Sequence, residues 1–323
     1  MKVSILGMGA FGIALTKILK KDIKISMWTN FEDELKSVEL KRENPIVLPD
    51  VIIDKKVELT TDLQKCLKNS DIVYFAIPSA AIREVAKKSS KYITEDQIIC
   101  ILTKGIEKST DLFMNQVIKE EIEFDNICML AGPSFAIDVS NRNSLGMVVA
   151  GKDELDRQKI ITSLDLNFLT LMQTSDILGV EISAAVKNVF AIICGMMNGM
   201  NESDSTKAAI MTSIINDFRL IIGVLGGKES TFYSYAGIGD LLLTCMSPKS
   251  RNYTFGTLLG SQPQKSLSDI LESMKVKTIE GLYTLESLYS ILKEKQIIIN
   301  SIYLLYDIIY NGKKIDNLLK EIS

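Results

Sequence analysis

Residues 2–12, KVSILGMGAFG, decide the fold of the N-terminal half of this 323-residue chain. The apolar run 2–6 is typical of a buried strand, and it is followed by Gly7, Gly9 and Gly12 at the start of a stretch of helical period. Glycines permit a tight turn and a close approach of the backbone to a pyrophosphate, which the N–H groups and dipole of the following helix attract. In this context the glycines predict dinucleotide binding, and a purely structural turn is the alternative.

The rest of the chain divides into two patterns. To about residue 175, short apolar runs alternate with amphipathic stretches, at 3–6, 23–28, 72–77, 98–102, 127–130, 147–150 and 168–172. Strands that are apolar on both faces predict a mainly parallel sheet covered by helices. Segments of helical period follow, at 180–197, 206–223, 266–274 and 284–292. We therefore expect an α/β domain over 1–175 and an all-helical domain over 176–323, with the boundary near Ser175 placed by the change of period alone.

Composition excludes several classes of protein. Hydrophobic residues make up 46% and charged residues 24%, as in a folded globular chain. The net charge of -3 gives no basic surplus for binding nucleic acid or an anionic membrane. No stretch without a charged residue exceeds 14 residues, so we expect no membrane span. The N-terminus enters a strand pattern without a leader, which predicts a cytoplasmic protein.

Cysteine and histidine usage limits the chemistry that is available. The 5 cysteines form no CxxC motif and lie mostly in apolar runs, so we expect buried free thiols. The chain has 0 histidines, which removes the commonest general base and the commonest zinc ligand. We expect no metal site, and acid–base chemistry must use Lys, Asp, Glu, Tyr or Cys.

Lys187 is the most informative single residue. Over 177–200 the charged residues are Glu181 and Lys187, and helical spacing places small or apolar side chains beside the lysine, at 183, 184, 190 and 191. Partial desolvation lowers the pKa of a lysine and suits it to accept a proton from a substrate hydroxyl. The alternative is a lysine that extends from a core helix to water.

Three further segments carry polar groups. Lys104 follows the predicted strand 98–102 at the sheet edge where open α/β folds bind ligands, although it also fits a solvated loop lysine. Residues 131–136, AGPSFA, fit a ligand site or a turn into a helix capped by Ser134. Residues 250–252, Ser-Arg-Asn, offer a hydroxyl, a forked cation and an amide that suit a phosphate, and a capped helix with a surface arginine is the alternative.

The end of the second predicted strand bears on the choice of cofactor. Trp28-Thr29-Asn30 contains neither an acid for ribose hydroxyls nor a base for a 2′-phosphate. Glu32 and Asp33 follow closely and would repel a 2′-phosphate, which favours NAD slightly over NADP.

Taken together, these residues resemble the NAD(P)-dependent glycerol-3-phosphate dehydrogenase family from Met1 to about Lys314. The motifs occur in the family's order and spacing: 7–12, Asn44-x-x-x-Leu48-Pro49, Pro78-Ser79, Thr103-Lys104-Gly105, 132–136, Ala185-Val186-Lys187-Asn188, Gly237-x-Gly239-Asp240-x-x-x-Thr244, 250–252 and Glu280-Gly281-x-x-Thr284.

The resemblance implies a Rossmann domain followed by a helical domain, which interconvert sn-glycerol 3-phosphate and dihydroxyacetone phosphate by hydride transfer at C2 with NAD or NADP. It implies that Lys187 accepts the proton, with Lys104 and Asp240 as the other catalytic residues. The implied substrate-binding residues are Lys104, Gly132, Ser134, Lys187, Asp240, Ser250, Arg251 and Asn252. The implied cofactor-binding residues are Gly7, Gly9, Ala10, Phe11, Gly12, Lys104, Ala136, Arg251 and Glu280. A homodimer that supplies glycerol 3-phosphate for phospholipid synthesis is also implied.

Several positions depart from the family pattern. Asn30 stands where the family usually has His or Arg, and Thr278 stands where it usually has Val. Ser205 and Ser213 replace Asn and Arg, which bears on turnover. Two alternatives stay open: a hydroxyacid or sugar-acid dehydrogenase that shares the fold and the helix lysine, and a dinucleotide-binding sensor without turnover, which Ser205 and Ser213 favour. The segment 250–252 argues against the first, and Lys187 with Asp240 argues against the second.

Overall fold

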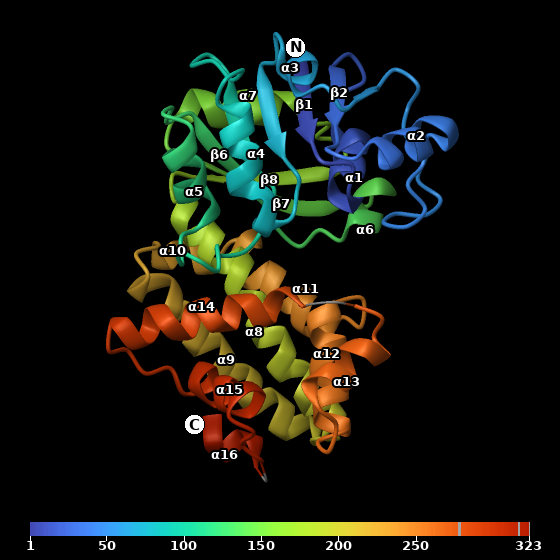
Figure 1. Ribbon diagram of the computed structural model, residues 1–323. Coiled ribbons are helices and arrows are strands. Elements are labelled where there is room, and N and C mark those ends of the chain that lie inside the picture. The colour runs from blue at the N-terminus through green and yellow to red at the C-terminus, as the bar shows by residue number, and fades with distance from the viewer. Residues whose placement is uncertain (277–278, 316, 323) are drawn as a thin grey trace. The chain divides into compact units, whose positions relative to one another are not determined.

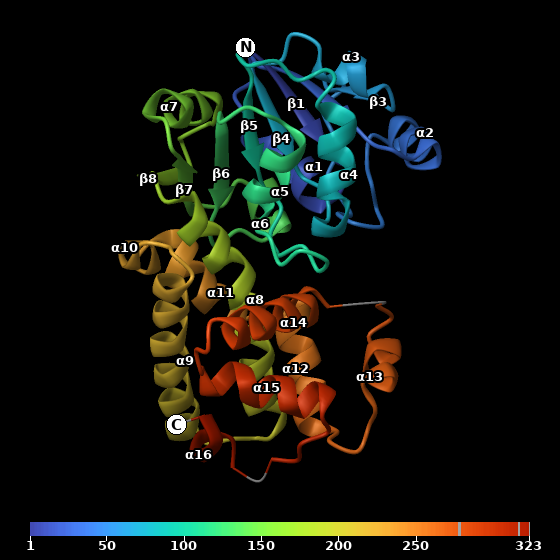
Figure 2. The same cartoon turned by 60° about the vertical axis from the view of Figure 1, so that its left-hand side comes forward.

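The computed structural model describes residues 1–276, 279–315 and 317–322. The chain divides into two compact units, one made of Met1–Lys104 with Met114–Ile177 and the other of Gly105–Phe113 with Leu178–Ser323 (Figures 1 and 2). Ile106 and Phe113 pair in a short bridge and pack into the core of the second unit. The domain boundary near Ser175 was drawn from periodicity and stays a prediction.

The first unit is built on one eight-stranded sheet, which confirms the mainly parallel Rossmann-type fold. The strand order is β3-β2-β1-β4-β5-β6-β7-β8, and among these pairs β6 and β7 run antiparallel. The strands are β1 (Lys2–Leu6), β2 (Lys24–Trp28), β3 (Glu58–Thr60), β4 (Ile72–Phe75), β5 (Ile98–Ile101), β6 (Ile127–Ala131), β7 (Leu145–Gly151) and β8 (Leu169–Thr174). Strand β3 was not predicted, because three residues are too few to show a period.

Helices cover this sheet because its strands are apolar on both faces. The helical segments are α1 (Ala10–Ile18), α2 (Glu32–Lys41), α3 (Leu63–Leu67), η1 (Ser79–Ala81), α4 (Ile82–Ser89), α5 (Met114–Glu121), α6 (Ala136–Ser140) and α7 (Glu154–Ser163). Along β1, Val3 and Ile5 share a core cluster with α1, whereas the hydroxyl of Ser4 donates to the carbonyl oxygen of Cys66 in α3 at 2.6 Å. Helix α1 packs against α6, and α4 packs against α5 (Figure 1).

The second unit is helical and is organised around one long helix, α8 (Ile177–Gly199). The segments that follow it are α9 (Asp204–Val224), α10 (Glu229–Phe232), η2 (Tyr235–Gly239), α11 (Asp240–Met246), α12 (Arg251–Ser261), α13 (Leu267–Ser273), α14 (Glu280–Glu294), α15 (Asn300–Tyr310) and α16 (Leu318–Ile322). The core of the unit joins α8 to side chains from α9, α11, α12, α14 and α15. The four segments predicted by helical period correspond to α8, α9, α13 and α14.

Glycines bring α8 and α12 into close contact. A Cβ on Gly195 of α8 would lie 2.0 Å from the carbonyl oxygen of Tyr253, and a Cβ on Gly256 of α12 would lie 2.0 Å from that of Ile192. No side chain fits in so small a separation, so both positions require glycine. This contact fixes the first half of α12 relative to the C-terminal half of α8.

Helix α8 is long and apolar enough to cross a membrane by length and composition, with a mean hydropathy of 1.8. However, 89% of its apolar window is buried inside the protein, as in the core helix of a globular unit. Within the described ranges it is the one helix that passes this test.

Candidate active site

The glycine turn has the shape that a dinucleotide requires. Gly7 has a φ of +120°, and a Cβ there would lie 2.4 Å from the carbonyl oxygen of Ala76. A Cβ on Gly12 would lie 2.3 Å from the carbonyl oxygen of Gly7, so the turn closes tightly on α1. Gly9 caps α1, and a Cβ there would meet nothing within 4 Å. The open side of the turn therefore faces the N-terminus of α1, which fits a bound pyrophosphate.

Other predicted residues of the first unit lie after the ends of β5 and β6. Lys104 is half-buried, and the hydroxyl of the preceding Thr103 donates to the carbonyl oxygen of Ile77 at 2.7 Å. Gly132 has a φ of +155°, and a Cβ there would lie 2.8 Å from the carbonyl oxygen of Gly146. Since β5 and β6 are parallel neighbours, Lys104 and Gly132 follow the same edge of the sheet as the glycine turn.

The suggestion that Ser134 caps a helix is wrong. Phe135 is the N-cap of α6, and the hydroxyl of Ser134 donates instead to the carbonyl oxygen of Gly132 at 3.0 Å. Ser134 and Ala136 are half-buried, as are Ala10 and Phe11 at the start of α1.

In the second unit, Lys187 of α8 forms an ion pair with Asp240, the first residue of α11. The two side chains are 7% and 1% exposed, so Lys187 does not extend into water. The neighbours of Lys187 within the helix suggested a purely apolar face. Asp240 shows that this face also carries a charged group. Burial disfavours a charged amine, whereas an adjacent carboxylate stabilises it, and the two effects oppose each other at Lys187. The carboxylate also fixes the direction in which the amine points.

The Ser-Arg-Asn segment begins α12. Ser250 is the N-cap, and its hydroxyl oxygen accepts from the N–H of Tyr253 at 3.3 Å. Arg251 is exposed, and its guanidinium lies 3.7 Å from the carboxylate of Glu280. Asn252 is buried, and its side-chain oxygen accepts from the N–H of Gly281 at 2.9 Å. The capped helix with a surface arginine is thus present, and the phosphate site stays a prediction.

Two residues without a predicted role join this cluster. The amide of Asn188 donates to the carboxylate of Glu280 at 3.4 Å, and a Cβ on Gly281 would lie 2.7 Å from the carbonyl oxygen of Asn188. The beginning of α14 therefore meets α8 one residue after Lys187, and it contacts the beginning of α12 through Asn252. Nothing in the sequence indicates this contact, because the three segments lie far apart along the chain.

Burial removes three of the cysteines as acid–base candidates. All five are free and buried, as predicted. Burial raises the pKa of Cys66 and of Cys128 to about 12 and that of Cys245 well above its usual value. These thiols stay protonated near neutral pH. The described residues also contain no group of three or more His, Cys, Asp or Glu that would hold a metal.

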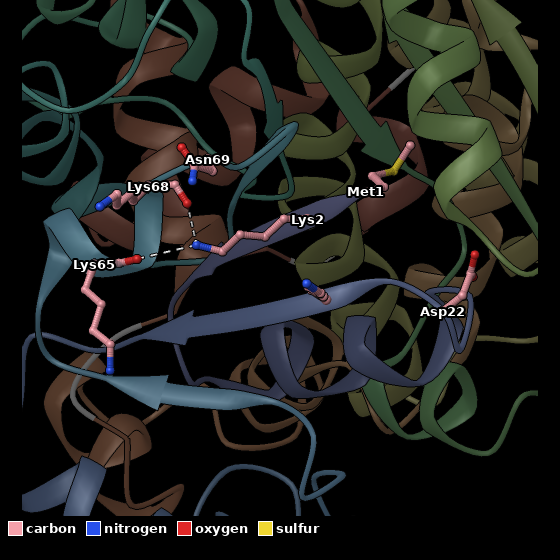
Figure 3. A pocket seen from close by; sticks show the side chains of 7 residues that line it. Met1, Lys2, Asp22, Lys65, Lys68 and Asn69 are labelled. Carbon is pink, nitrogen blue, oxygen red and sulfur yellow. Dashed lines mark hydrogen bonds between the residues drawn. The ribbon is translucent and has the colours of Figure 1, made fainter.

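A pocket of about 440 Å³ lies in the first unit. Figure 3 shows that Lys2, Lys65 and Lys68 line it. Lys2 and Lys24 are the first residues of β1 and β2, so the pocket lies at the edge of the sheet opposite the glycine turn. The amine of Lys2 donates to main-chain carbonyl oxygens at the end of α3, and Lys65 pairs with Glu58 at 2.7 Å. These contacts join the beginning of β1 to α3, and α3 to β3.

The positions that depart from the family pattern lie apart from the ion pair in sequence. Asn30 and Ser205 are exposed, and Ser213 is half-buried in α9. Thr278 lies outside the described residues.

Comparisons with known proteins give the family. The N-terminal model of NAD-dependent glycerol-3-phosphate dehydrogenase matches residues 2–156, and the C-terminal model matches residues 176–320. A glycerol-3-phosphate dehydrogenase (NAD(P)+) of Bacillus pumilus is 31% identical over 99% of this chain and 93% of its own. One from Clostridium acetobutylicum is 37% identical over 80% of this chain and 78% of its own.

Among solved structures, the glycerol-3-phosphate dehydrogenase of Coxiella burnetii has a TM-score of 0.90 and 25% identity, covering 99% of this chain and 98% of that one. The D-mandelate dehydrogenase with NADH and anilino(oxo)acetate has a TM-score of 0.62 and 12% identity, which reflects a common fold. Both halves of the chain match, and relatives above 30% identity cover nearly all of it. The chain therefore belongs to the NAD-dependent glycerol-3-phosphate dehydrogenase family.

Proposed function

We propose that this chain is an NAD(P)-dependent glycerol-3-phosphate dehydrogenase in which Lys187 exchanges the proton of the C2 hydroxyl. The observation that carries the proposal is the buried ion pair of Lys187 with Asp240 in a member of this family. A bound nicotinamide supplies the hydride chemistry at C2 of the substrate. The remaining steps belong to side chains of the protein.

Lys187 moves the proton. When glycerol 3-phosphate is oxidised, the amine of Lys187 accepts the proton of the C2 hydroxyl. When dihydroxyacetone phosphate is reduced, the ammonium of Lys187 returns that proton to the carbonyl oxygen. Asp240 holds the amine in one direction and offsets its charge while the ammonium form exists. Lys104 offsets negative charge on the substrate.

The start of α12 binds the phosphate. The hydroxyl oxygen of Ser250 already accepts from a main-chain N–H, so its proton is available for donation to a phosphate oxygen. The side-chain oxygen of Asn252 already accepts from the N–H of Gly281, so its NH₂ group is left to donate to a phosphate oxygen. Arg251 adds a forked cation, and the N-terminus of an 11-residue helix favours an anion.

The first unit holds the dinucleotide on the glycine turn. We assign the pyrophosphate to the N-terminus of α1, where the open side of Gly9 leaves room for it. Gly132 and Ser134 contact the substrate. The proposed cofactor residues are Gly7, Gly9, Ala10, Phe11, Gly12, Lys104, Ala136, Arg251 and Glu280. Phospholipid supply, a homodimer and a cytoplasmic location stay predictions from the sequence and the family resemblance.

Turnover with dihydroxyacetone phosphate tests this proposal. We expect the purified protein to oxidise NADH or NADPH when dihydroxyacetone phosphate is added, measured by the loss of reduced-cofactor absorbance. A 2-keto acid serves as the competing substrate, because a hydroxyacid dehydrogenase of the same fold would prefer it. Faster turnover of the keto acid, or cofactor binding without turnover of either substrate, would refute the proposal.

A further inference from the structure

One carboxylate of α2 is tied to the glycine turn by buried polar groups. Glu34 accepts from the hydroxyl of Thr29 and, at 3.1 Å, from the side-chain amide of Asn44. The same amide nitrogen of Asn44 donates to the carbonyl oxygen of Met8 at 3.2 Å. Thr29 and Asn44 are buried, 3% and 6% exposed. The side chain of Asn44 therefore links the negative charge of Glu34 to Met8, the residue between Gly7 and Gly9.

This position lies beside the end of β2. The N–H of Gly7 donates to the carbonyl oxygen of Trp28 at 2.8 Å, so the glycine turn and the end of β2 are joined directly. In dinucleotide-binding sheets this end of the second strand meets the adenosine ribose. An acid there binds the ribose hydroxyls, whereas a cation accepts a 2′-phosphate. Glu34 places an acid in this region although it is not part of the strand.

The neighbouring charged groups are less suited to this role. Glu32 is exposed and accepts from the hydroxyl of Thr61 at 2.7 Å, and Asp33 is exposed. Asn30 supplies no cation for a 2′-phosphate. The guanidinium of Arg42, beyond the other end of α2, donates to main-chain carbonyl oxygens, including that of Val57 at 2.8 Å. Among the acids in the first turn of α2, Glu34 is the one that this network holds against the turn.

We propose that Glu34 sets the cofactor preference of this chain, favouring NAD(H) over NADP(H). A carboxylate offers about four acceptor positions. Thr29 and Asn44 use two of them. The remaining positions accept from a ribose hydroxyl, whereas the negative charge repels a 2′-phosphate. The inference rests on the proposed function for its choice of ligand, and it concerns binding rather than turnover.

Binding of both reduced cofactors to the full chain, without substrate, tests the inference. Titration calorimetry should give an affinity for NADH at least about tenfold above that for NADPH. Glu34→Gln keeps the shape and removes the charge, so it should lower this ratio about tenfold, mainly by tightening NADPH binding. Glu32→Gln is the matched control, because it removes an exposed acid from the same turn, and it should leave the ratio unchanged.

The inference is overturned if the unaltered chain binds NADPH as tightly as NADH, or if Glu32→Gln changes the ratio as much as Glu34→Gln does. If Glu34→Gln does not fold, Glu34→Ala takes its place in the same comparison. A protein that prefers NADH in binding, loses this preference in the Glu34 variant and turns over no dihydroxyacetone phosphate would support the role of Glu34 and refute the proposed function. Turnover of dihydroxyacetone phosphate with equal affinity for the two cofactors would support the proposed function and refute the role of Glu34.

Discussion

The buried pair of Lys187 and Asp240 predicts a large loss of stability when one partner loses its charge. The two side chains are 7% and 1% exposed, so water cannot replace the missing partner. Removing one member of a buried ion pair costs about 3–5 kcal/mol, because the other charge stays buried. Asp240→Asn keeps the shape of the side chain, so we expect the lower end, about 3 kcal/mol. Lys187→Met should cost a similar amount.

A double-mutant cycle separates this pair energy from simple damage to the core. The double variant Lys187→Met, Asp240→Asn should lose at least about 2 kcal/mol less than the sum of the two single losses, because neither charge is then buried alone. Glu229→Gln, which breaks an exposed ion pair with Arg219 in the same unit, is the control and should change stability much less.

Urea unfolding followed by helical circular dichroism is the appropriate assay, because the single tryptophan, Trp28, lies in the other unit and would not report on α8. Additive losses, or a loss below about 1 kcal/mol for Asp240→Asn, would refute the reasoning from burial.

Three further predictions concern packing, titration and the glycine turn. Gly256→Ala should lower the free energy of unfolding in urea by at least about 2 kcal/mol, because its Cβ would lie 2.0 Å from a carbonyl oxygen. Gly223→Ala, whose Cβ would meet nothing within 4 Å, should raise this free energy by about 0.5–1 kcal/mol. Equal effects of the two substitutions would contradict the close contact. Burial raises the pKa of Asp217 despite a hydrogen bond from Ser301, so the folded chain favours the protonated carboxyl. The stability that this protonated form contributes is fully present below the ordinary pKa of 3.8 and is lost as pH rises through the raised pKa. Asp217→Asn should therefore be increasingly favoured over the original chain across that window, and a difference in unfolding free energy that does not vary with pH would be inconsistent with this. Gly9→Ala should leave the melting temperature of the free protein unchanged, since its Cβ meets nothing within 4 Å, and should weaken NADH binding at least about tenfold by calorimetry; unchanged affinity would remove the pyrophosphate from this turn.

The sheet could be predicted from the sequence because its signal is local. Strands buried on both faces, such as β4 and β5, are continuous apolar runs that stand out from their flanks. The glycine turn is equally local, since its spacing lies within six residues. Short elements such as β3 and α10 were not predicted, because three or four residues show no period.

The arrangement of the candidate site could be predicted only in part. Helical spacing identified the neighbours of Lys187 within α8, which are small or apolar, but it carries no information about what another helix presents to them. Asp240 comes from α11 and forms a buried ion pair with Lys187 among these apolar side chains. Likewise, Glu34 was overlooked beside Glu32 and Asp33, because its link to the glycine turn passes through Asn44, ten residues further along the chain.

The central claim is that the amine of Lys187 carries the proton at C2, and Lys187→Ala tests it most directly. The rate of NADH oxidation with saturating dihydroxyacetone phosphate should fall at least about a hundredfold, whereas the affinity for NADH should stay within about threefold of that of the original chain. A variant that binds NADH normally and keeps its rate within about tenfold would contradict the account, because some other group would then be moving the proton.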